Sequence, residues 1–268
     1  MILVDSHSHL FLEEFSADLP QVMDRARKAG VSHIFMPNID STTIEPMLSV
    51  CAAYKDLCFP MIGLHPTSVN ESYEKELAIV ADRLAAPHDF VAIGEIGLDL
   101  YWDKTFLKQQ CAAFEQQIEW ALMYDLPIVI HSREAFELIC KVLSPYKNTS
   151  LRGIFHSFTG SVEEAVRLLD FSQFLIGING VVTFKKSTLP EALKEIPLQR
   201  IVLETDSPYL TPMPNRGKRN ESANLKDTLM KVAEVYNMPP ELVAQTTSVN
   251  ALKMFGMLKY GQKDFKIY

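Results

Sequence analysis

The sequence is poor in several features that mark particular classes of protein. It holds 4 cysteines, and none of them forms a C-x-x-C pair. Cys51, Cys111 and Cys140 fall in apolar, helix-like patterns, which is typical of buried thiols in a reducing compartment. No apolar run approaches the roughly 18 residues of a membrane span, and no basic segment precedes the first apolar residues. We therefore expect a cytoplasmic protein without a signal peptide and without membrane contact.

Positive charge is also scarce. The chain has 26 Lys and Arg against 33 Asp and Glu, a net charge of −7, which argues against a broad basic face that coats nucleic acid. A small basic mouth around an active site is still compatible with this balance. A chain of 268 residues can bury roughly three quarters of its unfolded surface. It needs no disulfide or structural metal to fold, so a bound metal would serve chemistry.

The segment after the first apolar run lacks the glycines of a phosphate-binding loop. Ser6, His7, Ser8 and His9 follow it, and no glycine occurs before Gly30, which argues against an open dinucleotide-binding sheet. Short apolar runs recur every 25–35 residues or so and alternate with amphipathic stretches, as expected of βα units in a parallel sheet. The runs begin at Ile2, Ile34, Phe59, Phe90, Ile128, Gly153, Phe174 and Ile201.

Eight strand–helix units in one chain of this length predict an α/β fold, a single-domain (β/α)₈ TIM barrel. We place the barrel over residues 1–257 and a C-terminal tail over 258–268. Helical spacing from Leu19 ends before Gly30, Ser161 and Glu164 form a capping box, and Lys104–Asp125 reads as a long helix.

Histidines and carboxylates gather at the carboxyl ends of these predicted strands. In a barrel these ends meet on one face, where active sites lie. His7 and His9 are two residues apart on a strand and share a face. A carboxylate after a run as apolar as Val91–Gly94 must be paired or metal-bound, because burying it alone is costly. The strand-end residues are His7, His9, His65, His131 and His156, with Glu95 ending the fourth strand and Asp206 the eighth.

Each of these residues has a structural interpretation when it is taken alone. His131 or His156 could be a satisfied core histidine, and Asp206 could cap a turn. Four imidazoles and two carboxylates at matching strand ends are much harder to explain in that way. Together they suit Zn, Mn, Fe or Ni, and Mg less well. Six ligands exceed the three that hold one catalytic zinc, so the pattern favours two divalent ions bridged by a carboxylate.

Several motifs resemble those of the TatD family of metal-dependent deoxyribonucleases, in the amidohydrolase superfamily of barrels. The resemblance runs from residue 2 to about residue 257. The segments that carry it are Asp5–His9 (DSHSH), Gly63–Pro66 (GLHP), Gly94–Asp99 (GEIGLD), His131–Arg133 (HSR), His156–Gly160 (HSFTG), Leu203–Leu210 (LETDSPYL), Arg216–Glu221 (RGKRNE) and Asn250–Gly256.

The resemblance implies a role for each position of the metal set. His7, His9 and Asp206 would hold one ion, His131 and His156 the other, and Glu95 would bridge them. Asp206 would also take a proton from the attacking water, and His65 would contact substrate and no metal. Two positions depart from the family pattern: Thr67 replaces a frequent second histidine, and Ser157 replaces a frequent cysteine.

Candidate substrate contacts flank the metal set. Arg133 would bind a phosphate, or would be a surface partner of Glu134 or Glu137. Trp102 and Tyr209 would stack bases, or would be core aromatics. Arg216, Lys218 and Arg219 would clamp a DNA backbone, or would be a solvated loop balanced by Glu221.

These residues together predict an enzyme. The function that we expect is a two-metal phosphodiesterase that binds DNA transiently and cuts ends or single strands, working as a monomer or small homo-oligomer. The alternative is a metal-dependent amidohydrolase or lactonase acting on a small C–N or C–O substrate, since the fold alone does not choose. A non-catalytic nucleic-acid binder fits less well because it has no need of a base such as Asp206.

Overall fold

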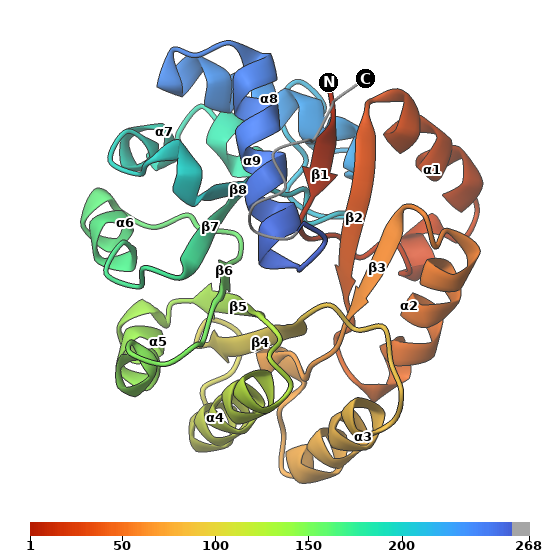
Figure 1. The fold of residues 1–268 in the computed structure, drawn as a ribbon, viewed down its shortest axis with the longest axis vertical. Helices are drawn as coiled ribbons and strands as arrows, with labels where there is room; N and C mark the ends of the chain where they lie inside the picture. The colour runs from red at the N-terminus through yellow and green to blue at the C-terminus, as the bar shows by residue number, and fades with distance from the viewer. Residues whose placement is uncertain (259–268) are drawn as a thin grey trace.

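The chain alternates strand and helix along its length, in a computed structural model that describes residues 1–258 (Figure 1). The strands are β1 (Leu3–Asp5), β2 (Val31–Pro37), β3 (Cys58–Met61), β4 (Ile93–Asp99), β5 (Ile128–Arg133), β6 (Gly153–Phe155), β7 (Phe174–Ile178) and β8 (Ile201–Leu203). The α-helices are α1 (Leu19–Lys28), α2 (Ser41–Ala53), α3 (Tyr73–Ala85), α4 (Leu107–Met123), α5 (Phe136–Leu143), α6 (Val162–Leu168), α7 (Leu189–Leu193), α8 (Leu225–Tyr236) and α9 (Pro240–Met254). The predicted tail, from 259 onward, lies outside the described residues.

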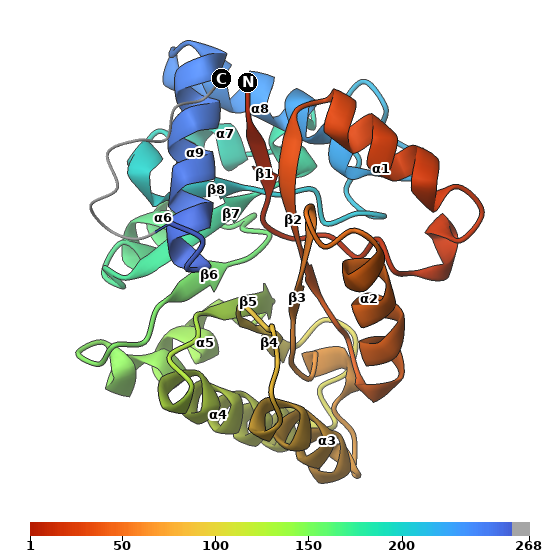
Figure 2. The ribbon, with the colours of Figure 1, turned by 45° about the vertical axis from the view of Figure 1, so that its right-hand side comes forward.

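The strands form two parallel sheets, β1-β2-β3 and β4-β5-β6-β7-β8, that meet at two seams. Single parallel bridges join Ser8 to Ser207 at one seam and Ile62 to Ile93 at the other. Further backbone hydrogen bonds cross the first seam, from Ser6 N to Leu203 O at 3.0 Å and from His9 N to Ser207 O at 2.8 Å. These contacts close the strands into the predicted barrel, with helices around the outside (Figures 1 and 2).

The barrel interior is filled by side chains and is not a pore. One buried apolar layer takes a residue from each strand or from its immediate start, and residues at the end of α9 pack against it. Its members are Val4, Phe35, Met61, Ala92, Val129, Ile154, Leu175 and Val202, packed with Ala251, Leu252, Met254 and Phe255. Because this layer seals one end of the barrel, polar groups can converge only at the opposite end, where the strands finish.

Local sequence explains how several elements begin and end. In α1 a proline occupies the first turn, where its missing N–H costs nothing, and the chain turns back at Gly30 with φ +88°. The predicted capping box of α6 is present: Ser161 Oγ accepts from Glu164 N, and Ser161 N donates to Glu164 Oε2. The predicted long helix is α4, slightly shorter than expected.

Two predicted strand starts are wrong by three residues each, and two others, at Ile2 and Phe59, differ by one residue. The second strand starts at Val31, three residues before Ile34. The fourth starts at Ile93 instead of Phe90 and runs on to Asp99, so Glu95 lies inside the strand and does not end it. Apolarity alone misplaced both, because Ser32 and His33 are polar but belong to β2, whereas the apolar residues 90–92 precede β4. Within residues 1–258 the cysteines are free thiols, and no helix is both long and apolar enough to cross a bilayer.

Candidate metal centre

Glu95 lies at the middle of the polar end of the barrel. Ile93 pairs with Ile128 and Ile96 pairs with Ile130, so β4 advances by three residues where β5 advances by two. The extra residue is a bulge, a feature that redirects a side chain out of the regular alternation. The Glu95 side chain is 3% exposed, and the surrounding histidines hold its carboxyl pKa well below the usual range despite the opposing effect of burial.

The two oxygens of Glu95 face different histidines. Oε2 lies 3.1 Å from His7 Nε2 and 3.7 Å from His9 Nε2. Oε1 lies 2.9 Å from His131 Nδ1 and 3.6 Å from His156 Nε2. By ligand-atom distance the described residues form three groups that could hold a cation, and Glu95 belongs to two of them: His7, His9 and Glu95; His7, His156 and Asp206; and His65, Glu95 and His131.

His7 and His9 extend from the end of β1 with their Nε2 atoms 3.1 Å apart. Two lone pairs at this distance repel unless a proton or a cation lies between them. The Nδ1 atoms of both rings are buried and have no hydrogen-bond partner among the described residues. This arrangement suits a divalent cation held by the Nε2 atoms.

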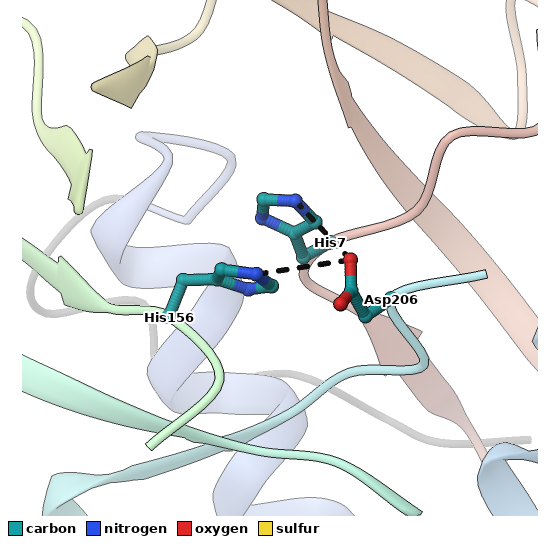
Figure 3. A group of neighbouring side chains, drawn as sticks. All are labelled: His7, His156 and Asp206. Atoms are coloured by element: carbon teal, nitrogen blue, oxygen red, sulfur yellow. Dashed lines mark ion pairs between the residues drawn. The ribbon is translucent and has the colours of Figure 1, made fainter. Parts of the chain in front are cut away.

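Asp206 completes this side of the site from the turn after β8. Its Oδ1 lies 3.8 Å from His7 Nε2 and 3.7 Å from His156 Nε2 (Figure 3). It also lies 3.6 Å from His9 Nε2. The residue adopts φ +55°, a left-handed conformation that aspartate tolerates better than most residues. Burial raises the carboxyl pKa, but the three histidines lower it below the usual range, so Asp206 is ionised at neutral pH.

Two carboxylates that the sequence analysis did not assign hold the metal-set histidines from behind. Asp99 Oδ2 lies 2.8 Å from His131 Nε2. Glu204 Oε1 lies 3.0 Å from His156 Nδ1, close enough for an ion pair. The angle between the two groups does not allow a hydrogen bond to the ring. A carboxylate hydrogen-bonded to a ligating ring orients it and raises its basicity, which describes Asp99, whereas Glu204 acts on His156 through its charge. Both residues stand inside the motifs quoted for the resemblance, and that position was the only signal for them.

The same carboxylates keep two rings protonated when no cation is present. Burial disfavours the charged ring, but the hydrogen bonds that the ring donates to the Asp99 and Glu95 carboxylates raise the pKa of His131 to about 9. Glu204, Glu95 and Asp206 likewise raise the pKa of His156 to about 10 against the effect of burial. Protons therefore occupy positions for which a metal ion would compete.

His65 lies close to this group but is oriented differently. Its Nε2 is 3.4 Å from Glu95 Oε1 and 3.3 Å from His131 Nδ1, so by distance alone it could complete a cation site with those two residues. However, its Nδ1 accepts the backbone N–H of Thr67 at 3.1 Å. A neutral ring then carries its proton on Nε2, which makes that nitrogen a donor toward Glu95. Thr67 thus orients His65, and Thr67 Oγ1 adds a 2.6 Å contact to the same nitrogen.

The predicted aromatic and basic residues are at the surface. Trp102 and Tyr209 are 68% and 51% exposed, so the interpretation as core aromatics is wrong. Arg133 does not pair with Glu134 or Glu137. Its guanidinium lies 3.9 Å from the ring centre of Tyr101 and 5.2 Å from that of Trp102.

One of the three residues of the predicted basic clamp already has a partner within the protein. Arg219 forms a two-pronged ion pair with Asp18, with both contacts at 2.8 Å, and this pairing makes it a structural residue. Glu221, expected to balance the loop, instead accepts from Arg25 at 2.7 and 2.6 Å. Arg216 and Lys218 are exposed and have no carboxylate partner within residues 1–258.

Comparison with known proteins agrees with this geometry. The family model described as "TatD related DNase" matches residues 4–256. The chain belongs to the TatD family. It is 38% identical over 255 residues to "Uncharacterized metal-dependent hydrolase YabD" of Bacillus subtilis, covering 95% of this chain and 99% of that protein. It is 33% identical to "3'-5' ssDNA/RNA exonuclease TatD" of Pantoea ananatis, covering 96% and 100%.

Solved structures show the same architecture. The Escherichia coli TatD homologue YJJV superposes with a TM-score of 0.85 at 27% identity, covering 95% of this chain and 98% of that chain. A phosphotriesterase homology protein of Escherichia coli, with phosphate in its active site, reaches a TM-score of 0.71 at 13% identity, covering 94% and 98%, and supports the barrel fold. The protein is therefore a metal-dependent hydrolase of the TatD family, and the clustered histidines and carboxylates are its candidate metal centre.

Proposed function

We propose that this TatD-family hydrolase cleaves phosphodiester bonds of DNA, at ends or in single strands, with two divalent ions. The observation that carries the proposal is an exposed aromatic–cation platform connected to the candidate metal centre by one side chain. Asp99 accepts from the backbone of Tyr101 at 2.9 Å and of Trp102 at 3.1 Å through Oδ1, while its Oδ2 contacts His131. The platform consists of Tyr101, Trp102 and Arg133.

This platform suits a single strand beside the metal centre. Aromatic faces stack any base without sequence preference, and guanidinium groups bind phosphate. Arg133 follows His131 by two positions on β5, so its cation lies at the mouth of the barrel. A hydrolase for small neutral amides or lactones needs neither an exposed tryptophan nor a stacked arginine at this place. The name of the Pantoea ananatis relative gives independent support.

The residues divide the chemistry among them. His7, His9 and Asp206 would hold one ion, His131 and His156 the other, with Glu95 between them. Ions held there would polarise the phosphodiester and acidify the attacking water. Asp206 is ionised, and only about a sixth of its side chain is exposed (15%). It would accept the water proton as the new P–O bond forms. As the ester P–O bond breaks, the leaving oxygen would take a proton from the protonated Asp206 or from solvent, which leaves a phosphate monoester and a free hydroxyl.

One comparison of substrates tests this proposal. Metal-loaded protein is incubated with 5′-labelled single-stranded DNA, a simple phosphodiester and a lactone, with chelator-treated protein as the control. We expect metal-dependent shortening of the DNA at a rate above that for either small substrate. Hydrolysis of the lactone with intact DNA would overturn the proposal and favour the amidohydrolase or lactonase alternative.

A further inference from the structure

A cavity lies between the loop that follows β7 and the loop that follows β8. Its volume is about 560 Å³, within the range of roughly 300–1,000 Å³ typical of small-ligand sites. We call it the β7–β8 pocket, and its lining includes Val181, Phe184, Lys185, Lys186, Met213 and Arg216. Of these residues only Arg216 was expected to contact substrate.

The β7–β8 pocket is linked to the chain segment of the metal centre by a short path of hydrogen bonds. Asn179, the residue after β7, donates to Ser157 Oγ at 2.6 Å, and Ser157 follows His156 in the chain. The same Asn179 accepts from Val181 N at 3.0 Å and so starts the wall of the pocket. On the other side, Met213 N donates to Thr183 Oγ1 at 2.8 Å and ties the two loops together.

Three cationic side chains gather at this pocket on an acidic protein. Lys185, Lys186 and Arg216 line it, and none has a carboxylate partner in the part of the chain that the structure describes. The Arg216 guanidinium lies 4.2 Å from the ring centre of Phe184, a stacking contact. The chain carries a net charge of −7, so three free cations around one aromatic ring are a local concentration that favours an anion with a flat apolar part.

We propose that the β7–β8 pocket is a second nucleotide subsite, which holds a nucleotide of single-stranded DNA away from the bond that is cut. The base of this nucleotide stacks on the Arg216–Phe184 pair, because bases stack on both aromatic rings and guanidinium planes. Its phosphate contacts Lys185 and Lys186. The inference rests on the proposed function, and it adds a fixed position for the strand on the side of the mouth opposite the Tyr101–Trp102–Arg133 platform.

The test measures binding apart from cleavage. Metal-loaded protein carrying Asp206→Asn is titrated with a fluorescein-labelled oligothymidylate at several salt concentrations, and fluorescence anisotropy is recorded. Adding Lys185→Ala with Lys186→Ala should weaken binding and flatten the slope of log affinity against log salt by about 0.7 for each phosphate that is no longer bound. Phe184→Leu keeps an apolar side chain but removes the ring face. It should lower affinity about fivefold or more without changing the salt slope.

A matched pair of lysines controls for net charge. Lys28 and Lys194 are exposed, stand at the C-terminal ends of α1 and α7, and therefore lie toward the sealed end of the barrel. Lys28→Ala with Lys194→Ala should leave the slope near that of the parent. The subsite would be overturned if both double variants lost the same amount of DNA affinity. It would also be overturned if the Lys185→Ala, Lys186→Ala protein kept the affinity and the salt slope of the parent. Hydrolysis of a dinucleotide by the unmodified protein reports on the proposed function alone, since so short a substrate does not depend on a distant subsite.

Discussion

Replacing Glu95 by glutamine should remove most of the metal affinity while preserving the shape of the side chain. The five histidine nitrogens around this carboxylate lie 2.9 to 3.7 Å from its oxygens. A unit charge pair about 4 Å apart contributes ~4 kcal/mol at an effective dielectric constant of about 20. Loss of the negative charge should therefore weaken the binding of a divalent ion by roughly a thousandfold or more.

Two measurements check this magnitude. At a zinc concentration of about a thousand times Kd, binding stabilises the folded protein by ~4 kcal/mol. In Glu95→Gln the same concentration would be near Kd, so the rise in Tm on adding zinc should almost vanish. Elemental analysis after gel filtration should show a fall from about two ions per chain.

The control for this experiment is Glu191→Gln, an exposed acid on α7 without an ion pair in the described residues. It should behave as the unmodified protein in both measurements. Unchanged metal content together with an unchanged thermal shift in Glu95→Gln would refute the assignment of Glu95 as the central ligand. A loss of fold in the absence of metal would be seen separately, by circular dichroism of the chelated variant.

Three further substitutions have expected outcomes. Asparagine tolerates the left-handed backbone at position 206, so Asp206→Asn should keep the fold and much of the metal. Its kcat should fall by at least about 10²–10⁴-fold, as expected when a positioned base is lost. A near-normal kcat with intact metal would remove Asp206 from the mechanism. Asp99→Asn should lower the pKa of His131 from about 9 and weaken metal binding by about 10–100-fold. Metal affinity is measured by competition with a chelator, and an unchanged affinity would contradict this prediction. Arg219→Ala should leave DNA affinity unaltered but lower stability at pH 7. The side-chain hydrogen bond from Arg219 holds the pKa of Asp18 at about 2, below its unfolded value of about 3.9. The stabilisation is therefore complete above about pH 4 and is lost as pH falls toward about 2, so the denaturation midpoints of variant and parent should converge over that range; a constant gap would argue against the ion pair.

The sequence alone was sufficient to predict the barrel, because each strand–helix unit carries its own signal. Short apolar runs, capping residues such as Ser161 and the turn at Gly30 act within a few residues of one another. Once eight parallel units are inferred, the common direction of the strands requires their carboxyl ends to meet. The convergence of His7, His131 and Asp206 follows from that topology, without knowledge of any side-chain contact.

Other features depend on distances between segments that no local pattern encodes. Arg219 and Asp18 stand 201 positions apart in the chain, so the pairing that takes Arg219 out of the predicted clamp could not be read from the basic run itself. The position of Glu95 depends on an extra residue in β4 relative to β5, and apolarity gives no indication of such a bulge. Tyr101 was missed for a similar reason, since its role arises from a contact with Arg133 on a different strand.

The sequence by itself therefore determined which groups reach the mouth of the barrel, and the tertiary structure decided how they are oriented there. The protonated nitrogen of His65 is set by the backbone of Thr67, and His131 is turned by Asp99. The division of the Glu95 oxygens among the histidines arises only when the ends of β1, β4, β5 and β6, which are not all neighbours, meet at one mouth of the barrel. The physical reason is that strand periodicity selects the face on which a side chain lies, whereas ring orientation and charge depend on hydrogen-bond partners brought in by long-range packing.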